Sequence, residues 1–414
     1  MSGLQVGPIN DFALGIYDGP HATPQEADEG PVFLGIKNVT PQGTLDLSEI
    51  RHVSEQEYPR WTKRVVPQSD DIVFSYEATL HRYAIIPENF RGCLGRRMAL
   101  IRPDKSKVVP RFLHYYFLSP TWRAQIESNI ISGATVDRVP LTRFPGFEVK
   151  LPNLALQERI ASILSAYDDL IENNRRRIQL LEQAARLLYK EWFVHLRFPG
   201  HEHVTVTDGV PEGWLHAELA DLCLGNSGIQ TGPFGSQLHQ SDYTDRGVPV
   251  VMPQDLKNLR ISTERIARVP EALAEKLARH RLAPSDIVYG RRGDIGRRAL
   301  VSDKEEGYLC GTGCLRLRPN QERVNPHFLY HALGDYRTQT LIRNRAKGST
   351  MPNLSAKLMA SLPVLVPSRL LQQQFGAFAT DNSREIELLT DAIAAARVAR
   401  DLLLPRLMNG EIAV

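Results

Sequence analysis

Short apolar runs separated by turn residues fill the first part of the chain. Each run is rich in Val, Ile, Leu or Phe and is bounded by Gly, Pro or Asp, so the runs predict short strands. Two helices interrupt them: one over residues 110–118, and one opened by Ser119-Pro120, where a capping residue precedes a proline at the first helical position. The mixture predicts an α+β fold with a small, twisted sheet. The predicted strands cover residues 32–36, 72–74, 83–86 and 98–101.

A longer pattern follows, in which apolar residues recur at alternating steps of four and three residues. This spacing places them at the a and d positions of a coiled-coil helix, and a similar, less regular stretch occurs near the C-terminus. An apolar stripe of this length must be covered, and the other helix is the nearest available partner. The expected seam of the first helix, counted from Ile160, is Leu164, Tyr167, Ile171, Asn174, Ile178, Leu181, Ala185, Leu188 and Trp192. That of the second is Phe375, Ala379, Asn382, Ile386, Leu389, Ile393, Ala396, Arg400, Leu403 and Leu407.

The two halves of the chain repeat one another at an offset of about 215 residues. The order of the repeated segments is kept, and each copy ends in one of the long helical stretches, which begin shortly after Pro152 and Pro367. A unit of this size can bury its own core, so the repeat predicts two globular domains and not a solenoid. The matching segments are 71–74 with 286–289, 102–103 with 318–319, 109–113 with 325–329, and 133–135 with 348–350.

If a twofold axis relates the two copies, the helices run antiparallel and the domains lie at opposite ends. A helix of about 40 residues measures roughly 60 Å, long enough to hold two domains over neighbouring turns of DNA, about 34–36 Å apart. Asn174 and Asn382 would then fix the register of the helix pair. The expected division is a first domain over 1–152, a helix over 153–198, a second domain over 199–367, and a second helix with the tail over 368–414.

The composition excludes several classes of protein. The chain is 42% hydrophobic and 23% charged, and it contains no apolar run long enough to span a bilayer. Its first residues lack the basic start and apolar stretch of a signal peptide, which favours a cytoplasmic location. The net charge of +3 is too small to indicate nucleic-acid binding by itself. Cys310-x3-Cys314 has no second pair at zinc spacing, so we expect two small apolar side chains on strands and no metal site.

Three motifs close the first helix, open the second domain and end the chain. They are Leu188-Tyr189-Lys190-Glu191-Trp192-Phe193-Val194-His195-Leu196-Arg197-Phe198-Pro199-Gly200, Pro211-Glu212-Gly213-Trp214, and Leu404-Pro405-Arg406-Leu407-Met408-Asn409-Gly410-Glu411-Ile412. With these motifs the chain resembles the specificity (S, HsdS) subunits of type I restriction-modification systems over essentially its whole length. The resemblance implies two target-recognition domains separated by two long antiparallel coiled-coil helices. The first domain departs from the family pattern, because it lacks a Gly-Trp entry and has Tyr76-Glu77-Ala78 in place of an Arg-Arg-Gly loop.

The resemblance also implies partners: double-stranded DNA, two methyltransferase (M) subunits and restriction/translocase (R) subunits. S-adenosylmethionine, ATP and magnesium would belong to those partners, because the chain has no methyltransferase motif, phosphate-binding loop or paired-carboxylate nuclease site. We therefore expect a non-catalytic subunit without cofactors, in which each domain reads half of a bipartite target and the helices set the spacing. Two alternatives remain: a DNA methyltransferase or nuclease in its own right, and a coiled-coil adaptor that binds proteins without reading DNA.

Candidate DNA contacts gather in one loop of each domain. In the second domain, four arginines flank two glycines, which let the backbone turn closely against phosphates while an arginine reaches guanine. The alternative is a solvated turn. The corresponding loop of the first domain keeps the frame but changes the side chains, as expected of domains that read different half-sites. The candidates are Arg291, Arg292, Gly293, Arg297 and Arg298 in the second domain, and Tyr76, His81 and Arg82 in the first.

Two further pairs of segments are candidates for DNA contact. Lys37-Asn38 and Gln254-Asp255 lie 217 residues apart after equivalent strands, and amide side chains suit adenine edges, although ordinary turns have the same composition. Basic and hydroxyl side chains around two repeated glycines suit phosphates, with a plain connecting loop as the alternative. These residues are Arg345, Lys347, Ser349 and Thr350 in the second domain, and Ser132, Thr135 and Arg138 in the first.

Overall fold

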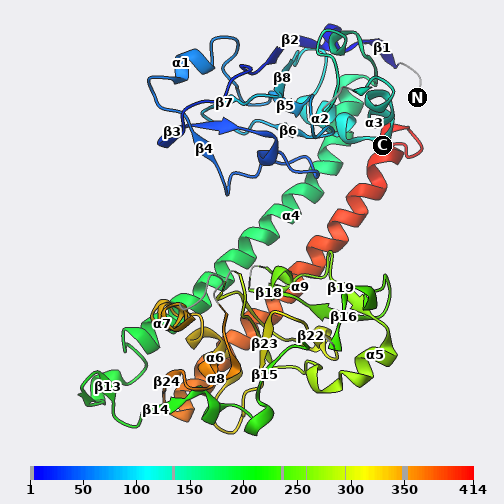
Figure 1. Ribbon diagram of the computed structural model, residues 1–414. Helices are drawn as coiled ribbons and strands as arrows, with labels where there is room; N and C mark the ends of the chain where they lie inside the picture. Colours follow the sequence, from blue (N-terminus) through cyan, green and yellow to red (C-terminus); the bar gives the residue numbers. More distant parts are fainter. Residues whose placement is uncertain (1–3, 133–135, 235–236, 258, 294, 347–352) are drawn as a thin grey trace. The chain divides into compact units, whose positions relative to one another are not determined.

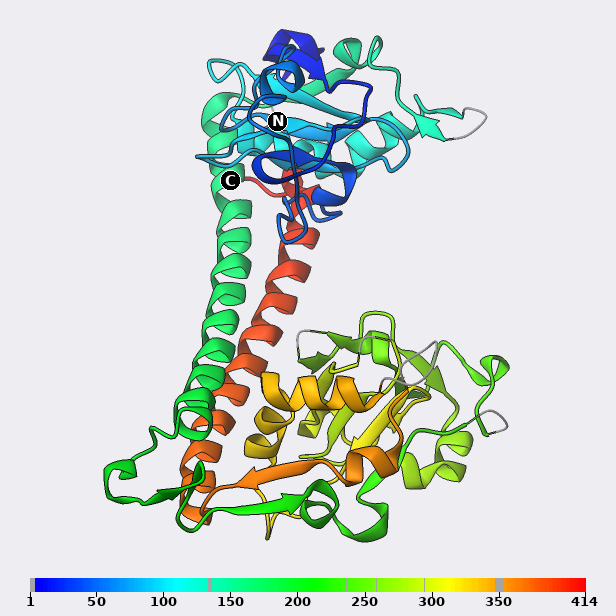
Figure 2. The same cartoon turned by 60° about the vertical axis from the view of Figure 1, so that its left-hand side comes forward.

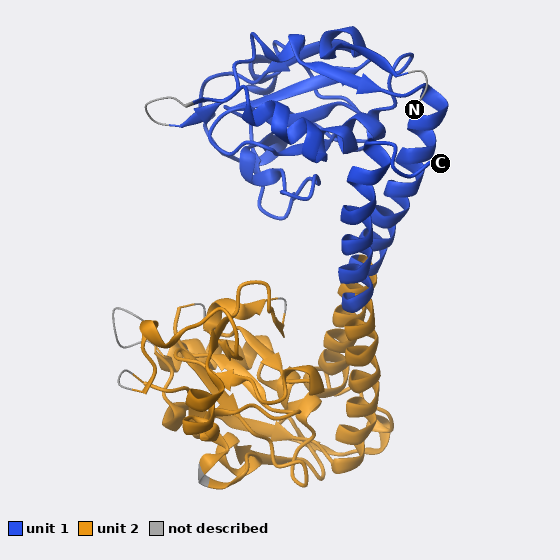
Figure 3. Ribbon diagram, turned by 90° about the vertical axis from the view of Figure 1, so that its right-hand side faces the viewer, with its two compact units in different colours: residues 1–175, 390–414 blue, residues 176–389 orange. Residues whose placement is uncertain are grey.

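The computed structural model describes residues 4–132, 136–234, 237–257, 259–293, 295–346 and 353–414. The chain forms two compact units (Figure 3), of which unit 1 comprises residues 1–175 and 390–414 and unit 2 comprises residues 176–389. Each unit contains one globular module and a part of each of two long helices, α4 (Leu154–Tyr189) and α9 (Arg369–Met408). Helix α4 is followed by one π-helical segment, Lys190–Val194. Among the described residues, none of the helices is both long enough and apolar enough to cross a membrane.

The module of unit 1 is built on a four-stranded antiparallel sheet and a smaller three-stranded sheet (Figure 1). The larger sheet has the order β2 (Ala13–Asp18), β8 (Met98–Pro103), β5 (Ile72–Ser75) and β6 (Tyr83–Ile85). The smaller has the order β4 (Arg51–His52), β3 (Ala27–Leu34) and β7 (Gly92–Leu94), with β3 and β7 parallel. Two more antiparallel pairs are β1 (Gln5–Pro8) with β11 (Glu148–Leu151), and β9 (Ile131–Ser132) with β10 (Asp137–Arg138). Its own helices are α1 (Tyr58–Trp61), α2 (Pro110–Leu118) and α3 (Pro120–Glu127).

Strand β5 is buried on both faces, and its side chains alternate between two cores as the period of a strand requires. Phe74 packs with the aromatic residues of α2 and α3, whereas Val73 packs in a separate cluster on the other face. In the aromatic cluster, the indole N–H of Trp122 donates to the Tyr83 hydroxyl at 3.0 Å. Burial of these rings accounts for the position of α2 and α3 against the sheet.

Most of the predicted elements of the first domain are confirmed, and one strand is corrected. The helix over 110–118 is α2, and the Ser119 side chain caps α3 by accepting from the Trp122 backbone N–H at 3.3 Å. The strand predicted over 32–36 ends at Leu34, and the chain then turns into a 3-10 segment, Ile36–Asn38. The buried Asn38 explains this turn, because its side-chain oxygen accepts from the Gly35 N–H at 3.0 Å.

Unit 2 repeats this architecture. Its larger sheet has the order β15 (Ile229–Thr231), β23 (Cys314–Leu317), β20 (Ile287–Gly290) and β21 (Arg298–Leu300). Its smaller sheet has the order β19 (Ala267–Val269), β16 (Val248–Val251) and β22 (Leu309–Cys310), with β16 and β22 parallel. Three antiparallel pairs are β14 (Leu215–Glu218) with β24 (Pro363–Val366), β17 (Leu256–Lys257) with β18 (Arg260–Ile261), and β12 (Val206–Thr207) with β13 (Val210–Pro211). Its own helices are α5 (Glu271–Lys276), α6 (Pro326–Ala332), α7 (Tyr336–Ala346) and α8 (Ala356–Ala360).

The sequence repeat is also a repeat of buried polar contacts. In unit 1, the Arg102 guanidinium donates to both oxygens of Asp71, at 2.9 and 2.7 Å, and the Asp71 residue is only 2% exposed. In unit 2, Arg318 donates to Asp286 at 2.8 and 2.7 Å in the same bidentate manner. Because a buried carboxylate without a partner is costly, these pairs explain why both residues recur in the two copies.

A buried glutamine joins each long helix to its module. The side-chain nitrogens of Gln157 and Gln372 each donate to the backbone oxygen of the proline five residues earlier. Their side-chain oxygens accept from the backbone N–H of the residue that precedes α2 in unit 1 and α6 in unit 2. Those partners are Pro152 and Val109 in unit 1, and Pro367 and Asn325 in unit 2. Each helix therefore starts from a fixed position on its module.

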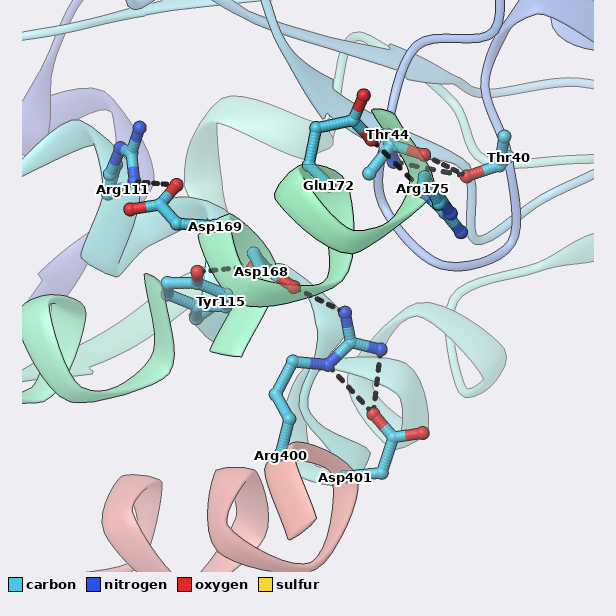
Figure 4. Close-up of polar contacts among 10 residues, drawn as sticks. All are labelled: Thr40, Thr44, Arg111, Tyr115, Asp168, Asp169, Glu172, Arg175, Arg400 and Asp401. Atoms are coloured by element: carbon cyan, nitrogen blue, oxygen red, sulfur yellow. Dashed lines mark hydrogen bonds and ion pairs between the residues drawn. The ribbon is translucent and has the colours of Figure 1, made fainter. Parts of the chain in front are cut away.

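In unit 1, the beginning of α4 lies beside the end of α9 (Figure 4). Arg400 occupies a seam position of α9 and donates to Asp168 of α4 at 2.5 Å. The other oxygen of Asp168 accepts from the Tyr115 hydroxyl of α2, also at 2.5 Å. One carboxylate thus connects both long helices to the module of unit 1.

In unit 2, the remaining parts of the two helices also pair, and their contacts run in opposite directions. The Asn382 side chain donates to the Leu181 backbone oxygen at 3.2 Å, and Tyr189, further along α4, packs against Phe375, which lies earlier in α9. None of the predicted seam residues of either helix is exposed, and Asn174 is only 3% exposed. The predicted heptad seam is therefore confirmed as the covered face of each helix.

Candidate nucleic-acid interface

The loops that follow β5 and β20 share two positions of positive φ. Ala78 and Gly293 both have φ of 71°, and three residues later His81 and Gly296 also have positive φ, at 59° and 120°. A left-handed backbone costs roughly 1–2 kcal/mol for a residue other than glycine. Unit 1 thus keeps positive φ at both positions although Ala78 and His81 replace the glycines of unit 2.

In each unit this loop pairs with a later segment, which follows α3 in unit 1 and α7 in unit 2. Glu77 forms a β-bridge with Arg138 in unit 1, and Arg292 forms the equivalent bridge with Asn353 in unit 2. Arg138 is exposed on the β9–β10 hairpin, which projects from the module of unit 1 (Figure 2). In unit 1 the structure therefore brings together two segments that the sequence suggested separately. Four candidates, Thr135, Lys347, Ser349 and Thr350, lie outside the described residues.

Arg291 is directed into the protein and is only 6% exposed. Its guanidinium donates to the Leu354 backbone oxygen at 3.0 Å and to the Asn353 side-chain oxygen at 2.9 Å, and it lies 5.3 Å from the centre of the Phe234 ring. Burial lowers the pKa of Arg291. The residue holds three loop segments together, and the equivalent Tyr76 is also 6% exposed, with a pKa that burial raises to about 12.

The other candidates of the second loop divide into one inward and three outward residues. Arg298 is 9% exposed, donates to the Tyr330 backbone oxygen at 2.9 Å and lies 4.7 Å above the Tyr330 ring. Arg292, Gly293 and Arg297 are exposed. Among the described candidates of this loop, only these outward residues are placed to meet a molecule that approaches it.

In unit 1, the corresponding loop carries an ion cluster. The His81 ring lies 3.6 Å from the Glu127 carboxylate of α3, which Arg123 also contacts at 3.1 Å. Burial lowers the pKa of His81. Arg82 is half-buried, and its backbone oxygen accepts from Ser75 at 3.1 Å.

The 3-10 segments after β3 and β16 have the same side-chain cap, in which Asn38 or Asp255 accepts from the backbone N–H of the residue three positions earlier. Asn38 donates to the backbone oxygens of Asp46 and Glu49, both at 3.1 Å, and is therefore used within the fold. The equivalent Asp255 is 5% exposed and accepts from the Met252 N–H at 2.8 Å. Their neighbours Lys37 and Gln254 are exposed, and Lys37 lies 3.8 Å from Glu49.

A basic hollow of about 590 Å³ adjoins the second loop. Sequence reasoning missed two of its cations, Lys257 and Arg343, because they come from the β17–β18 hairpin and from α7, far from the loop in sequence. The sequence does contain a feature that could have identified Arg343: it occupies the position in α7 that corresponds to Glu127 in α3, so the charge at this repeated position is reversed. The lining residues are Leu256, Lys257, Leu259, Ile295, Gly296, Arg297, Arg298, Gln339 and Arg343.

The cysteines lie in the core, as expected. Cys310 ends β22 and Cys314 begins β23, and both are buried without a disulfide. Burial raises the pKa of Cys310 to about 12 and that of Cys314 well above its ordinary value. No group of His, Cys, Asp or Glu side chains suited to a metal ion occurs in the part of the chain that the structure describes.

Known proteins resemble the chain over most of its length. A family model, described as the type I restriction modification DNA specificity domain, matches residues 35–183 and 211–396. The type I restriction enzyme MjaIX specificity subunit of Methanocaldococcus jannaschii is 22% identical over 368 residues, which cover 88% of this chain and 82% of that protein. The type I restriction enzyme HindI specificity subunit of Haemophilus influenzae is 22% identical over 434 residues, covering 88% and 90%.

A solved structure has the same fold. The crystal structure of the S subunit of a type I restriction-modification system from M. genitalium has a TM-score of 0.58 and 17% identity, and it covers 98% of this chain and 96% of that one. The resemblance predicted from the sequence motifs is confirmed. Because the family model matches once in each copy of the internal repeat, and the two matches make up most of the chain, the chain belongs to the family of type I restriction modification DNA specificity proteins.

Proposed function

We propose that this chain is the sequence-specific DNA-binding subunit of a type I restriction-modification complex and carries no catalysis of its own. Each module reads one half of a bipartite, asymmetric target. The observation that carries this proposal is the loop after β5 in unit 1 and after β20 in unit 2, because equivalent positions of this loop carry different side chains in the two units. Exposed Arg292, whose guanidinium suits guanine O6 and N7, stands where unit 1 has the half-buried Glu77. The Glu77 carboxylate lies 3.0 Å from the Arg97 guanidinium, so the two units differ in charge and in exposure at this position.

Within each loop, inward residues hold the frame and outward residues meet the DNA. In unit 2 we assign the first role to Arg291 and Arg298, because both guanidinium groups already bind backbone oxygens of the module. In unit 1, Tyr76 and Asn38 have this role, since both are buried. The proposed contacts with bases or phosphates are Arg292, Gly293, Arg297, Gln254, Lys347, Ser349 and Thr350 in the second domain, and Lys37, His81, Arg82, Thr135 and Arg138 in the first.

The long helices set the spacing between the half-sites and dock the methyltransferase subunits. Leu187 and Leu402 occupy equivalent positions, 215 residues apart, and each is 60% exposed. A large apolar side chain exposed at the same position of both copies suits two identical partners, one for each unit. In this proposal the target-recognition domains cover 1–152 and 199–367, and the spacer helices lie in 153–198 and 368–414.

The partners supply the chemistry. Two M subunits would bring S-adenosylmethionine and methylate adenine N6, and R subunits would bring ATP-driven translocation and magnesium-dependent cleavage. This chain would contribute target choice, through base contacts, and geometry, through the helices. Removal of this chain should therefore abolish site-specific methylation without damaging the methyltransferase subunit itself.

Reconstitution with its methyltransferase tests the function. The complex should methylate adenine at a split target in a randomised DNA library, whereas the purified chain alone should methylate nothing. Arg292→Ala should relax the preference at one base pair of one half-site, by about 1–3 kcal/mol for a lost bidentate contact. A complex that forms but retains no DNA from the library would identify an adaptor without DNA readout and refute the proposal.

A further inference from the structure

We propose that the basic hollow of unit 2 is a binding site for a phosphate of the DNA backbone, made by Lys257, Arg297 and Arg343. The inference rests on the proposed function, which it extends by residues that the sequence motifs do not include. It concerns affinity and orientation, because a phosphate contact supports all sequences alike.

Cations from three separate elements converge on the hollow. Lys257 comes from the β17–β18 hairpin, Arg297 from the loop after β20, and Arg343 from the last turn of α7. Arg298 adds a fourth positive charge at the wall, although its Nε already donates to Tyr330. None of the lining residues is acidic among those that the structure describes. Lys257 has one carboxylate nearby, Glu264 at 3.9 Å, where both side chains are more than half exposed and the attraction is weak.

Gly296 keeps the hollow open. Its φ of 120° disfavours other residues, and a Cβ at this position would lie 2.2 Å from the Gln339 side-chain oxygen. Gln339 cannot easily move away, because its side-chain nitrogen donates to the Tyr289 hydroxyl at 2.6 Å and to the Leu333 backbone oxygen. The part of the lining that Gln339 forms is therefore fixed by buried hydrogen bonds.

The equivalent place in unit 1 has the opposite chemistry. His81 stands where unit 2 has Gly296, and Glu127 stands where unit 2 has Arg343. The imidazole and the carboxylate lie 3.6 Å apart, so side chains occupy the space that is open in unit 2. A carboxylate in this place would repel a phosphate. The inference is thus specific to unit 2, and it predicts that the two half-sites differ in their electrostatic contribution to binding.

The test measures binding of the complex with methyltransferase subunits to DNA over a range of salt concentrations. Arg343→Gln and Lys257→Gln should each weaken binding roughly eightfold at 0.1 M salt, because one phosphate contact contributes a slope of about 0.9 in log K against log salt. The loss should be equal for target and non-target DNA, and the salt slope should fall by about one unit for each substitution. Arg343→Lys should retain most of the binding.

Arg337→Gln is the matched control, because Arg337 is an exposed arginine of the same helix that does not line the hollow. It should leave the affinity and the salt slope unchanged. Two results would overturn the inference while the proposed function stands: a wild-type salt slope in both glutamine variants, or a loss of methyltransferase binding in place of DNA binding. If the wild-type complex binds no DNA at any salt concentration, the proposed function itself fails.

Discussion

Arg400→Met tests whether the polar connection in unit 1 holds the helix pair on its module. The substitution keeps the length and most of the apolar stem of a side chain that is 11% exposed, and it removes the guanidinium. Asp168 would then lose its donor from α9 and keep only the Tyr115 hydroxyl. Asp401, the other partner of Arg400, has a side chain that is 63% exposed.

The expected cost follows from the burial of the pair. Removal of one partner from a fully buried ion pair costs about 3–5 kcal/mol. The Asp168 side chain is 28% exposed and retains one donor, so we expect a smaller loss, about 2–3 kcal/mol for unit 1. Asp401→Asn should cost less than about 1 kcal/mol, because it breaks an exposed pair.

Amide hydrogen exchange measures the effect separately in each unit, which matters because a chain with two units need not unfold in one step. In Arg400→Met, the slowest amides of α2 and of the first part of α4 should exchange roughly 30- to 160-fold faster, whereas those of unit 2 should change little. The double variant with Asp168→Asn should cost less than the sum of the single losses. Exchange within twofold of wild type in Arg400→Met would refute the reasoning.

Three further predictions address the seam, the pKa of His331 and the spacing. Ile171→Asp should destabilise unit 1 by roughly 3–5 kcal/mol and Leu170→Asp by much less, because Ile171 is 4% and Leu170 46% exposed. Equal unfolding curves for the two variants would contradict the assignment of Ile171 to the covered face of α4. The pKa of His331 is lowered by burial to about 3, so its unfolded form gains protons first as pH falls below about 6.5, and stability is lost on acidification. His331→Tyr should remove about 2 kcal/mol of the loss of unit 2 stability between pH 7 and pH 5, measured by hydrogen exchange. An unchanged pH dependence would contradict a neutral His331 ring in the folded unit. Four residues inserted into both long helices at the boundary between the units should lengthen the target spacer by about two base pairs, read from the methylated sites. An unchanged spacer would contradict the proposal that the helix length sets the distance between the half-sites.

The sequence predicted the elements that depend on local pattern. Strand and helix positions in the first domain follow from short apolar runs and from the Ser119-Pro120 cap, and the heptad spacing identified the covered face of both helices. The repeat also identified residues whose contacts recur, such as Asp71 and Asp286, although their arginine partners are about 31 residues away in each case. Local propensity and periodicity are sufficient for these features because neighbours in sequence decide them.

The direction of individual side chains could not be predicted in the same way. Arg291 and Arg292 are adjacent and chemically identical, yet Arg291 is buried because Leu354 and Asn353, distant in sequence, supply oxygens for its guanidinium. The amide of Asn38, a candidate for base contact, is used by the backbone of its own loop. Pattern alone does not locate these partners, since tertiary packing brings them together.

Arg400 illustrates the same limit within a helix. The heptad count placed an arginine in an apolar seam without a reason for its presence. The structure provides one, because Asp168 of the facing helix and Tyr115 of the module complete its network (Figure 4). A charge at a seam position therefore indicated a specific partner across the helix pair.

Exchange of the first domain tests the central claim most directly. Residues 1–152 would be replaced by the corresponding segment of another specificity subunit, and adenine methylation would be mapped in cells that carry the hybrid and the methyltransferase. If each module reads its own half of the target, the hybrid should methylate a sequence with one new half-site and one unchanged half-site. A hybrid that supports methylation but changes both halves, or neither, would contradict the claim that the two modules read DNA independently.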